Sequence, residues 1–267
     1  MADDFDPDVA TGTMPTAALL IIGNEILSGR TRDANVSFLA EALGAAGIRV
    51  REARIVADDT AAIVDAVNAL RFNHTYVFSS GGIGPTHDDI TAAAMALAFA
   101  RPLVRHAEAE ARLRCHYRPE EINPARLRMA DMPEGAVLLD NPVSMAPGFR
   151  IGNVHVLPGV PRILQAMVQE LLPGLQGGPP LCSRTVSCLL PEGNIAADLA
   201  RIQAAFPHLT LGSYPYMRHG QIGTSLVVRG VDGESLNAAL AALATLVRDH
   251  GGEPSLVPAY SEEGGKR

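Results

Sequence analysis

The segment HTYVFSSGGIGPTHDDITAAAMALAFA, residues 74–100, predicts a buried strand, a glycine-rich loop and a helix in immediate succession. Backbone N–H groups at a glycine turn and at a helix N-terminus attract phosphate oxygens. Two adjacent carboxylates, Asp88 and Asp89, lie in the same loop. The segment therefore predicts either a site for phosphate and a metal, or a capped helix start that binds no ligand.

Electrostatics separates these two interpretations. At a distance of roughly 5 Å and an effective dielectric constant of about 20, a carboxylate repels a phosphate by on the order of 3 kcal/mol. A phosphate could then be held only with a divalent cation between the charges. Asp89 taken alone is better explained as a helix cap, which stabilises a helix by about 0.5–2 kcal/mol.

Two further strand–helix pairs precede this segment. Apolar or alternating runs at 17–23 and 48–56 predict strands, and amphipathic patterns predict helices from Asp33 to about Ala46 and from Asp58 onward. Such alternation implies right-handed crossovers and a mostly parallel sheet with helices on both faces, which is a three-layer α/β/α domain.

The carboxyl ends of parallel strands meet at one edge of a sheet, where ligands bind in such folds. We therefore expect three loops to converge. The residues concerned are Gly23 and Glu25 after the first strand, Asp58 after the second, and Gly81, Gly82, Gly84, Thr86, Asp88 and Asp89 after the third. Glycine at 81, 82 and 84 suits a backbone that approaches a ligand or adopts positive φ.

The rest of the chain divides at a Gly/Pro-rich stretch. Residues 105–135 predict further helices, and short strands are expected at VLLD, GFRI and VHVLPG before a helix that follows PGVP. After the stretch, a βαββα pattern predicts a smaller α+β domain with one more edge strand near its end. The predicted parts are a disordered leader (1–15), the main domain (16–175), a linker (176–182), the small domain (183–258) and a tail (259–267).

The composition excludes several classes of protein. Among 267 residues the formal net charge is −7, and no basic run occurs, which argues against nucleic-acid binding. Three cysteines without a CxxC pair indicate free thiols in a reducing compartment. The acidic start lacks the pattern of a signal sequence, and no apolar run is long enough to span a membrane, so we expect a cytoplasmic protein.

Several motifs in order resemble those of a known family. GNEILSGRTRDANVSFLAEAL, VADD, SSGGIGPTHDDIT, NPVSMAPGF and LPGVP are similar to the successive motifs of the molybdopterin-binding fold of molybdenum-cofactor biosynthesis proteins. The order most resembles the N-terminal part of the competence/damage-inducible protein A family. The similarity covers about residues 16–175, and the following module resembles the second domain of that family.

This resemblance implies an α/β/α domain that binds a phosphorylated nucleotide or pterin, with Asp58 and Asp89 acting with Mg²⁺ or a similar cation. It adds Pro147, Gly148, Pro158 and Gly159 to the expected ligand-binding residues. In this family the associated activity is metal-dependent hydrolysis of ADP-ribose. Many members also carry a deamidase domain, for which this chain is too short, so a short form without that activity is expected.

The chain departs from the family pattern at two places. Met145 stands where the family has threonine, and we expect it to pack, while Arg162 follows LPGVP in place of the usual acidic residue. Two alternatives to the pyrophosphatase remain: transfer of an adenylyl group to molybdopterin, and a ligand-binding or scaffold protein without turnover. Related folds form dimers or trimers, so the resemblance implies a homo-oligomer. Arg30, Arg32 and Arg162 are expected near the ligand as phosphate partners, and His87 in solvent.

Overall fold

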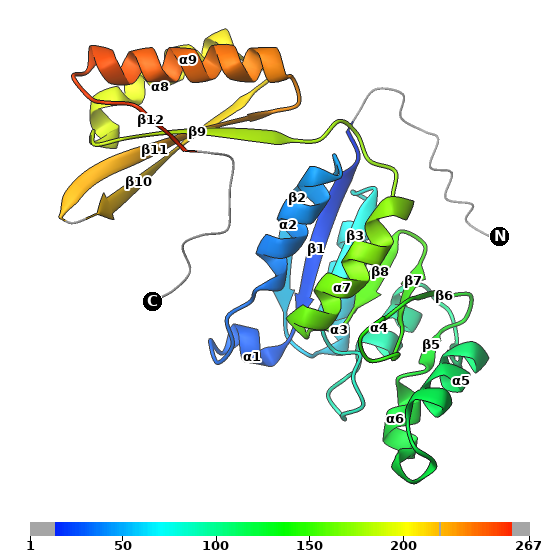
Figure 1. The fold of residues 1–267 in the computed structure, drawn as a ribbon. Helices are drawn as coiled ribbons and strands as arrows, with labels where there is room; N and C mark the ends of the chain where they lie inside the picture. Colours follow the sequence, from blue (N-terminus) through cyan, green and yellow to red (C-terminus); the bar gives the residue numbers. More distant parts are fainter. Residues whose placement is uncertain (1–13, 219, 258–267) are drawn as a thin grey trace. The chain divides into compact units, whose positions relative to one another are not determined.

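The chain folds into two compact units (Figure 1), which divide between Gly178 and Pro179, inside the predicted linker. The computed structural model describes residues 14–218 and 220–257. The predicted leader lies outside the described residues except for Met14 and Pro15, and the predicted tail lies wholly outside them. Each unit is described by itself.

The first unit is built on a six-stranded sheet in the order β2-β1-β3-β8-β7-β6. The four strands from β2 to β8 are parallel, and β7 and β6 run antiparallel to their neighbours. The bounds are β1 (Thr16–Ile22), β2 (Arg49–Val56), β3 (Tyr76–Ser80), β6 (Val137–Leu139), β7 (Gly148–Ile151) and β8 (Val154–Leu157). The mostly parallel sheet predicted from the sequence is confirmed.

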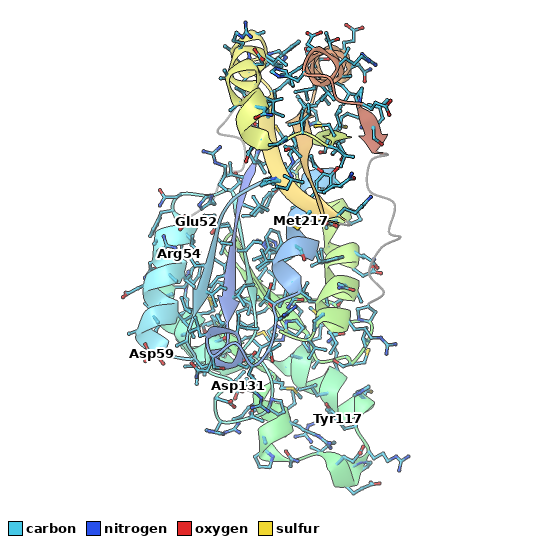
Figure 2. The ribbon with its side chains drawn as sticks, turned by 90° about the vertical axis from the view of Figure 1, so that its left-hand side faces the viewer. Glu52, Arg54, Asp59, Tyr117, Asp131 and Met217 are labelled. Carbon is cyan, nitrogen blue, oxygen red and sulfur yellow. The ribbon has the colours of Figure 1, made fainter. Side chains whose placement is uncertain are left out.

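Burial distinguishes the central strands from the edge. Residues 17–22 of β1 are all buried, as its continuous apolar run predicts for a strand covered on both faces. β2 lies at the edge and alternates between partly buried and exposed residues. Its charged residues include Glu52 and Arg54, which form an ion pair with 2.6 Å between Oε1 and Nε (Figure 2). Charged side chains of this kind discourage other strands from pairing with an open edge.

Helices cover both faces of the sheet. In Figure 1, α2 (Asn35–Ala45) and α7 (Pro161–Leu171) lie in front of it, and α3 (Thr60–Arg71) and α4 (Thr91–Ala98) lie behind it. One core joins α2 and α7 to Leu19 and Phe78, and the other joins α3 and α4 to Leu20 and Val77. Adjacent residues of each strand thus serve opposite faces, which confirms the three layers.

The segment predicted as helical at 105–135 is only partly so. It contains α5 (Ala107–His116), η1 (Pro119–Glu121) and α6 (Pro124–Arg128). It is framed by β4 (Leu103–Arg105) and β5 (Asp131–Pro133), which pair as a separate two-stranded sheet. The prediction missed both strands because three residues are too few to show an alternating pattern, and β5 also ends in proline, which is uncommon within strands.

The second unit has one four-stranded antiparallel sheet in the order β10-β11-β9-β12, as the βαββα pattern with an added edge strand predicts. Its core packs α8 and α9 against β9 and β11 through Val186, Ile195, Leu226 and Leu243. The bounds are β9 (Cys182–Cys188), α8 (Glu192–Ala205), β10 (Thr210–Arg218), β11 (Gln221–Gly230), α9 (Gly233–Asp249) and β12 (Ser255–Val257).

Two expectations drawn from the composition can be compared with the structure. Cys115, Cys182 and Cys188 are all free thiols, as predicted. Among the described helices, none combines the length and the apolar character that crossing a bilayer requires.

A buried histidine makes the stability of the first unit depend on pH. His155 on β8 is 2% exposed, and its ring stacks on that of Phe78 with 4.9 Å between centroids. Burial, helped by the positive charge of Arg150, lowers the pKa of His155 from 6.5 to about 4. Between these values the unfolded chain binds a proton that the native unit does not, so stability must fall as the pH falls.

We expect the free energy of unfolding to be about 2 kcal/mol lower at pH 5 than at pH 7.5 on account of His155. Urea denaturation followed by circular dichroism at both pH values measures the difference. The His155→Leu variant should lose this part of the pH dependence, whereas the exposed His116→Leu should keep it. Equal pH dependence in wild type and His155→Leu would contradict the assignment.

Candidate functional site

The carboxyl ends of β1, β2, β3 and β8 meet at one edge of the parallel sheet, where they border an open cleft of about 450 Å³. In Figure 1 this edge is at the lower end of β1, next to the short helix α1 (Asn24–Leu27). The loop after β6 and residue Met129 complete the wall. We call this space the main cleft. The predicted convergence of three loops therefore occurs, with a fourth from β8.

Most of the predicted ligand-binding residues line the main cleft. They are Gly23, Glu25, Asp58, Gly81, Gly82, Gly84, Asp88, Asp89, Pro147, Pro158 and Gly159. Two do not. Thr86 lines a smaller adjoining pocket, and Gly148 lies buried at the start of β7, where any Cβ would collide with the carbonyl of Val156 on β8. Gly148 therefore serves the packing of the sheet.

The glycine turn is shaped by close approach of the backbone to its neighbours. Gly81 has φ of 111° and Gly82 has φ of 68°, a region that favours glycine. A Cβ on Gly81 would overlap the carbonyl oxygen of Ile22, and one on Gly82 would overlap Oγ1 of Thr91. Thr91 is fully buried and donates its hydroxyl to the carbonyl of Gly81 at 3.0 Å. The turn thus fits between β1 and the first residue of α4.

Asp89 holds the loop together and does not cap the helix. The residue before α4 is Ile90, which makes no side-chain cap hydrogen bond, so the interpretation of Asp89 as a helix cap is wrong. Oδ2 of Asp89 instead accepts from the backbone N–H of Thr86 at 2.8 Å and from its hydroxyl at 2.5 Å. Hydrogen bonding to Thr86 and to its own backbone also keeps the pKa of Asp88 below its usual value, so this exposed carboxylate stays charged.

The adjacent pair Asp58 and Asp59 has divided functions. Oδ2 of Asp58 accepts from the backbone N–H of Asn24 at 2.8 Å and so ties the end of β2 to the loop after β1. Asp59, labelled in Figure 2, caps α3 by accepting from the N–H of Ala62 at 2.9 Å. Asp58 lines the main cleft and Asp59 does not. The choice of Asp58 from the DD pair agrees with this placement.

The N–H groups of the glycines differ in availability. That of Gly81 donates to the carbonyl of Leu157 at 3.1 Å, and that of Gly23 donates to Val56 at 3.2 Å. Neither can therefore hold a phosphate, contrary to the expectation for Gly81. In the part of the chain that the structure describes, the N–H groups of Gly82 and Gly84 have no such partner.

A buried asparagine that sequence reasoning missed supports two sides of the cleft. Asn35, the first residue of α2, is 3% exposed and donates through Nδ2 to Ser80 Oγ and to the carbonyl of Gly159, each at 2.9 Å. It thereby joins the end of β3 to the loop after β8. Its Oδ1 is buried without a partner among the described residues. The only signal was its position in the family motif GRTRDANVSFL.

The loop after β6 is organised by Asn141. Its Nδ2 donates to Ser144 Oγ and to the carbonyl of Ala146, each at 2.8 Å, and its Oδ1 accepts from two backbone N–H groups. Met145 has φ of 58° and is 42% exposed. The expectation that Met145 packs is wrong, because this left-handed backbone position turns its side chain out of the core. Met145 is absent from the cleft wall.

The carboxylates of the main cleft do not form a metal cage by themselves. Among the described residues, no three His, Cys, Asp or Glu side chains gather closely enough to hold an ion. Mg²⁺ in proteins commonly uses one or two carboxylates together with substrate phosphates and water. Asp58 and Asp89 each employ one oxygen, Oδ2, in the hydrogen bonds described above. Their chemistry therefore fits a cation that a phosphorylated ligand helps to bind.

A smaller pocket of about 90 Å³ adjoins the main cleft, and the two share Gly82, Gly84 and Asp89. We call it the side pocket. Arg128, at the end of α6, lines it. The three arginines expected near a phosphate, Arg30, Arg32 and Arg162, are exposed and line neither space. His87, with its side chain 96% exposed, is at the rim of the side pocket, in solvent as expected.

Each of the two units matches a family model. Residues 18–177 match the family model described as "Probable molybdopterin binding domain", and residues 180–252 match "FAD synthase, middle domain". A CinA-like protein of Desulfosudis oleivorans is 36% identical over 73% of this chain and 51% of its own length. The chain belongs to the CinA-like family of molybdopterin-binding-domain proteins. The family resemblance of the motifs is thereby confirmed.

Other relatives of this CinA-like chain have different names. A "Probable FAD synthase" of Caenorhabditis elegans is 31% identical over 88% of the chain and 50% of its own length. The chain thus spans about half the length of these curated relatives. The crystal structure of the protein CinA from Thermoplasma acidophilum is similar at 34% identity and a TM-score of 0.56, and covers 60% of this chain and 98% of that one.

We expect Gly82→Ala to destabilise the first unit by more than the about 1–2 kcal/mol that positive φ alone costs, because its Cβ would overlap Thr91. The matched control is Gly135→Ala, whose φ is 83° and whose Cβ would meet nothing within 4 Å. Urea midpoints measure both. Equal losses in the two variants would show that the contact with Thr91 is unimportant.

We expect Asn35→Ala to cost about 1–3 kcal/mol, since it leaves Ser80 and the carbonyl of Gly159 without their buried donor. Asn73→Ala, which removes an exposed side-chain hydrogen bond to Ala69, should change stability by less than about 0.5 kcal/mol. Thermal denaturation of both variants tests this. A loss at Asn35 no larger than at Asn73 would refute its linking role.

Proposed function

We propose that the main cleft binds a phosphorylated nucleotide together with a divalent cation and hydrolyses the pyrophosphate bond of ADP-ribose-like nucleotides. One observation carries the proposal: four carboxylates line the same cleft as a glycine turn whose N–H groups at Gly82 and Gly84 are unpaired among the described residues. The carboxylates belong to Glu25, Asp58, Asp88 and Asp89.

The charge of the cleft supports a cation-dependent reaction. No Arg or Lys is among the described residues that line the main cleft, so all the charged side chains of its described wall are acidic. Each carboxylate within roughly 5 Å of a phosphate would repel it by on the order of 3 kcal/mol. A divalent cation held by Asp58 and Asp89 would neutralise the phosphoryl oxygens and the charge that develops on them.

The chain's own groups then bind and orient. The N–H groups of Gly82 and Gly84 donate to phosphate oxygens. Thr86 keeps the Asp89 carboxylate in place, and the N–H of Asn24 does the same for Asp58. In the reaction, the oxygen of water joins one phosphorus and the bridging oxygen leaves with the other. ADP-ribose is thereby split into AMP and ribose 5-phosphate.

A second candidate rests on the comparisons. The second unit matches the middle domain of FAD synthase, and proteins named as FAD synthases are among the relatives. FAD and ADP-ribose share an ADP moiety, so one cleft could accept either.

Transfer of an adenylyl group to molybdopterin also acts on an adenylyl phosphate. Binding without turnover remains the alternative of another class, and calorimetry without product formation would favour it.

We expect Asp58→Asn and Asp89→Asn each to lower the rate of Mg²⁺-dependent ADP-ribose hydrolysis at least a hundredfold, because each removes a charge that would hold the cation. Chromatography of the AMP formed measures the rate. FAD alone, and molybdopterin together with ATP, are tested in parallel as alternative substrates. EDTA should abolish the wild-type activity.

Asp59→Asn is the matched control, since asparagine caps a helix as well as aspartate does and Asp59 does not line the cleft. It should keep the wild-type rate. Unchanged hydrolysis in Asp89→Asn would exclude its assigned role. Products from FAD or from molybdopterin plus ATP, but none from ADP-ribose, would replace the leading candidate with the corresponding alternative.

A further inference from the structure

We propose that Arg128 binds the second phosphate of a diphosphate ligand in the side pocket, while the first phosphate lies at the N–H groups of Gly82 and Gly84. This inference rests on the proposed function and defines the ligand class of the same site as nucleoside diphosphates and their esters. The observation that supports it is that one arginine lies next to the glycine loop.

The two spaces form a continuous site with unequal lobes. The main cleft, of about 450 Å³, has room for a nucleoside and a phosphate, whereas the side pocket, of about 90 Å³, suits a group the size of one phosphate. Gly82, Gly84 and Asp89 border both. A diphosphate that passes across Gly84 would therefore present one phosphate to each lobe.

Arg128 supplies the positive charge that the main cleft lacks. Among the described residues that line either lobe, it is the only Lys or Arg. Asp131 lies in the same pocket, but its carboxylate pairs with Arg105, with 2.5 Å between Oδ1 and Nε. The carboxylate of Asp131 is therefore already paired with Arg105, and the positive charge of Arg128 can act on a ligand. Arginine binds phosphate through two parallel N–H donors.

The position of Arg128 is set on both sides. Its Nη2 donates to the carbonyl of Pro85 in the glycine loop at 3.0 Å. Two residues after Arg128, Ala130 anchors the chain. Ala130 is fully buried, and its carbonyl accepts from the N–H of His106 at 2.9 Å. A guanidinium has five N–H donors, and the bond to Pro85 uses one. Within residues 14–218 and 220–257 the other donors form no hydrogen bond, so they can bind a phosphate.

A competing explanation is that Arg128 only clamps the glycine loop through Pro85. A clamp would affect every ligand of the loop to the same degree. A phosphate anchor affects only ligands that reach the side pocket. Comparison of AMP with ADP separates the two, because the molecules differ by the second phosphate alone.

The test is isothermal titration of the full chain with AMP and ADP in the presence of Mg²⁺. The wild type should bind ADP at least tenfold more tightly than AMP. Arg128→Ala should weaken ADP binding at least tenfold and AMP binding less than threefold. Arg128→Gln serves as a second variant should the alanine variant be unstable. Arg126→Ala is the control in the same helix, since Arg126 bonds to the carbonyl of Glu121 and lines neither lobe.

The outcomes are distinguishable. A wild type that binds neither nucleotide would reject the proposed function before Arg128 is considered. A wild type that binds both without preference, or an Arg128 variant that loses AMP and ADP equally, would overturn the role of Arg128 and leave nucleotide binding at the glycine loop intact. Loss of the ADP preference in Arg126→Ala as well would attribute the effect to α6 as a whole.

Discussion

The pairing of β3 with a strand on each side constrains the loops at the carboxyl edge of the sheet. Because β1 and β8 flank β3 in parallel, the chain must leave β3 between Ile22 and the loop after β8. The N–H of Gly81 completes that pairing by donating to Leu157, and no side chain fits at Gly81 or Gly82. The turn is therefore tight enough to place the next carboxylates, Asp88 and Asp89, at the cleft beside the strand ends.

Several carboxylates lie at the same edge of the sheet, and hydrogen bonds from the protein satisfy only some of their oxygens. Thr86 and the N–H of Asn24 each satisfy one oxygen of an aspartate, and Asn35 links the opposite walls. These bonds orient the carboxylates without neutralising them. The carboxylates are thus oriented by the fold itself, and under the proposed function their remaining negative charge would favour a ligand that brings a cation with it. Preorganisation of this kind lowers the cost of binding.

How much could be predicted from the sequence depends on the range of the interactions. The strand–helix units, the shared edge and the placement of Asp58 and Asp89 in one cleft followed from local patterns and motifs. Asn35 and Arg128 were missed because their partners are 124 and 43 positions away, and no local pattern encodes such distances. The alternative interpretation of Asp89 as a cap failed because Ile90, and not Asp89, directly precedes the helix, and Met145 was misinterpreted because its backbone conformation is not visible in the letters.

The divided duties of Asp58 and Asp59 have an evolutionary consequence. One aspartate caps α3 and its neighbour lines the cleft, so a change at the cleft residue leaves the helix cap in place. A lineage can therefore exchange the cleft residue by single-base changes while natural selection keeps the helix. A scaffold of this kind can carry different chemistries, because the residues at the cleft can change while those that hold the helix stay the same.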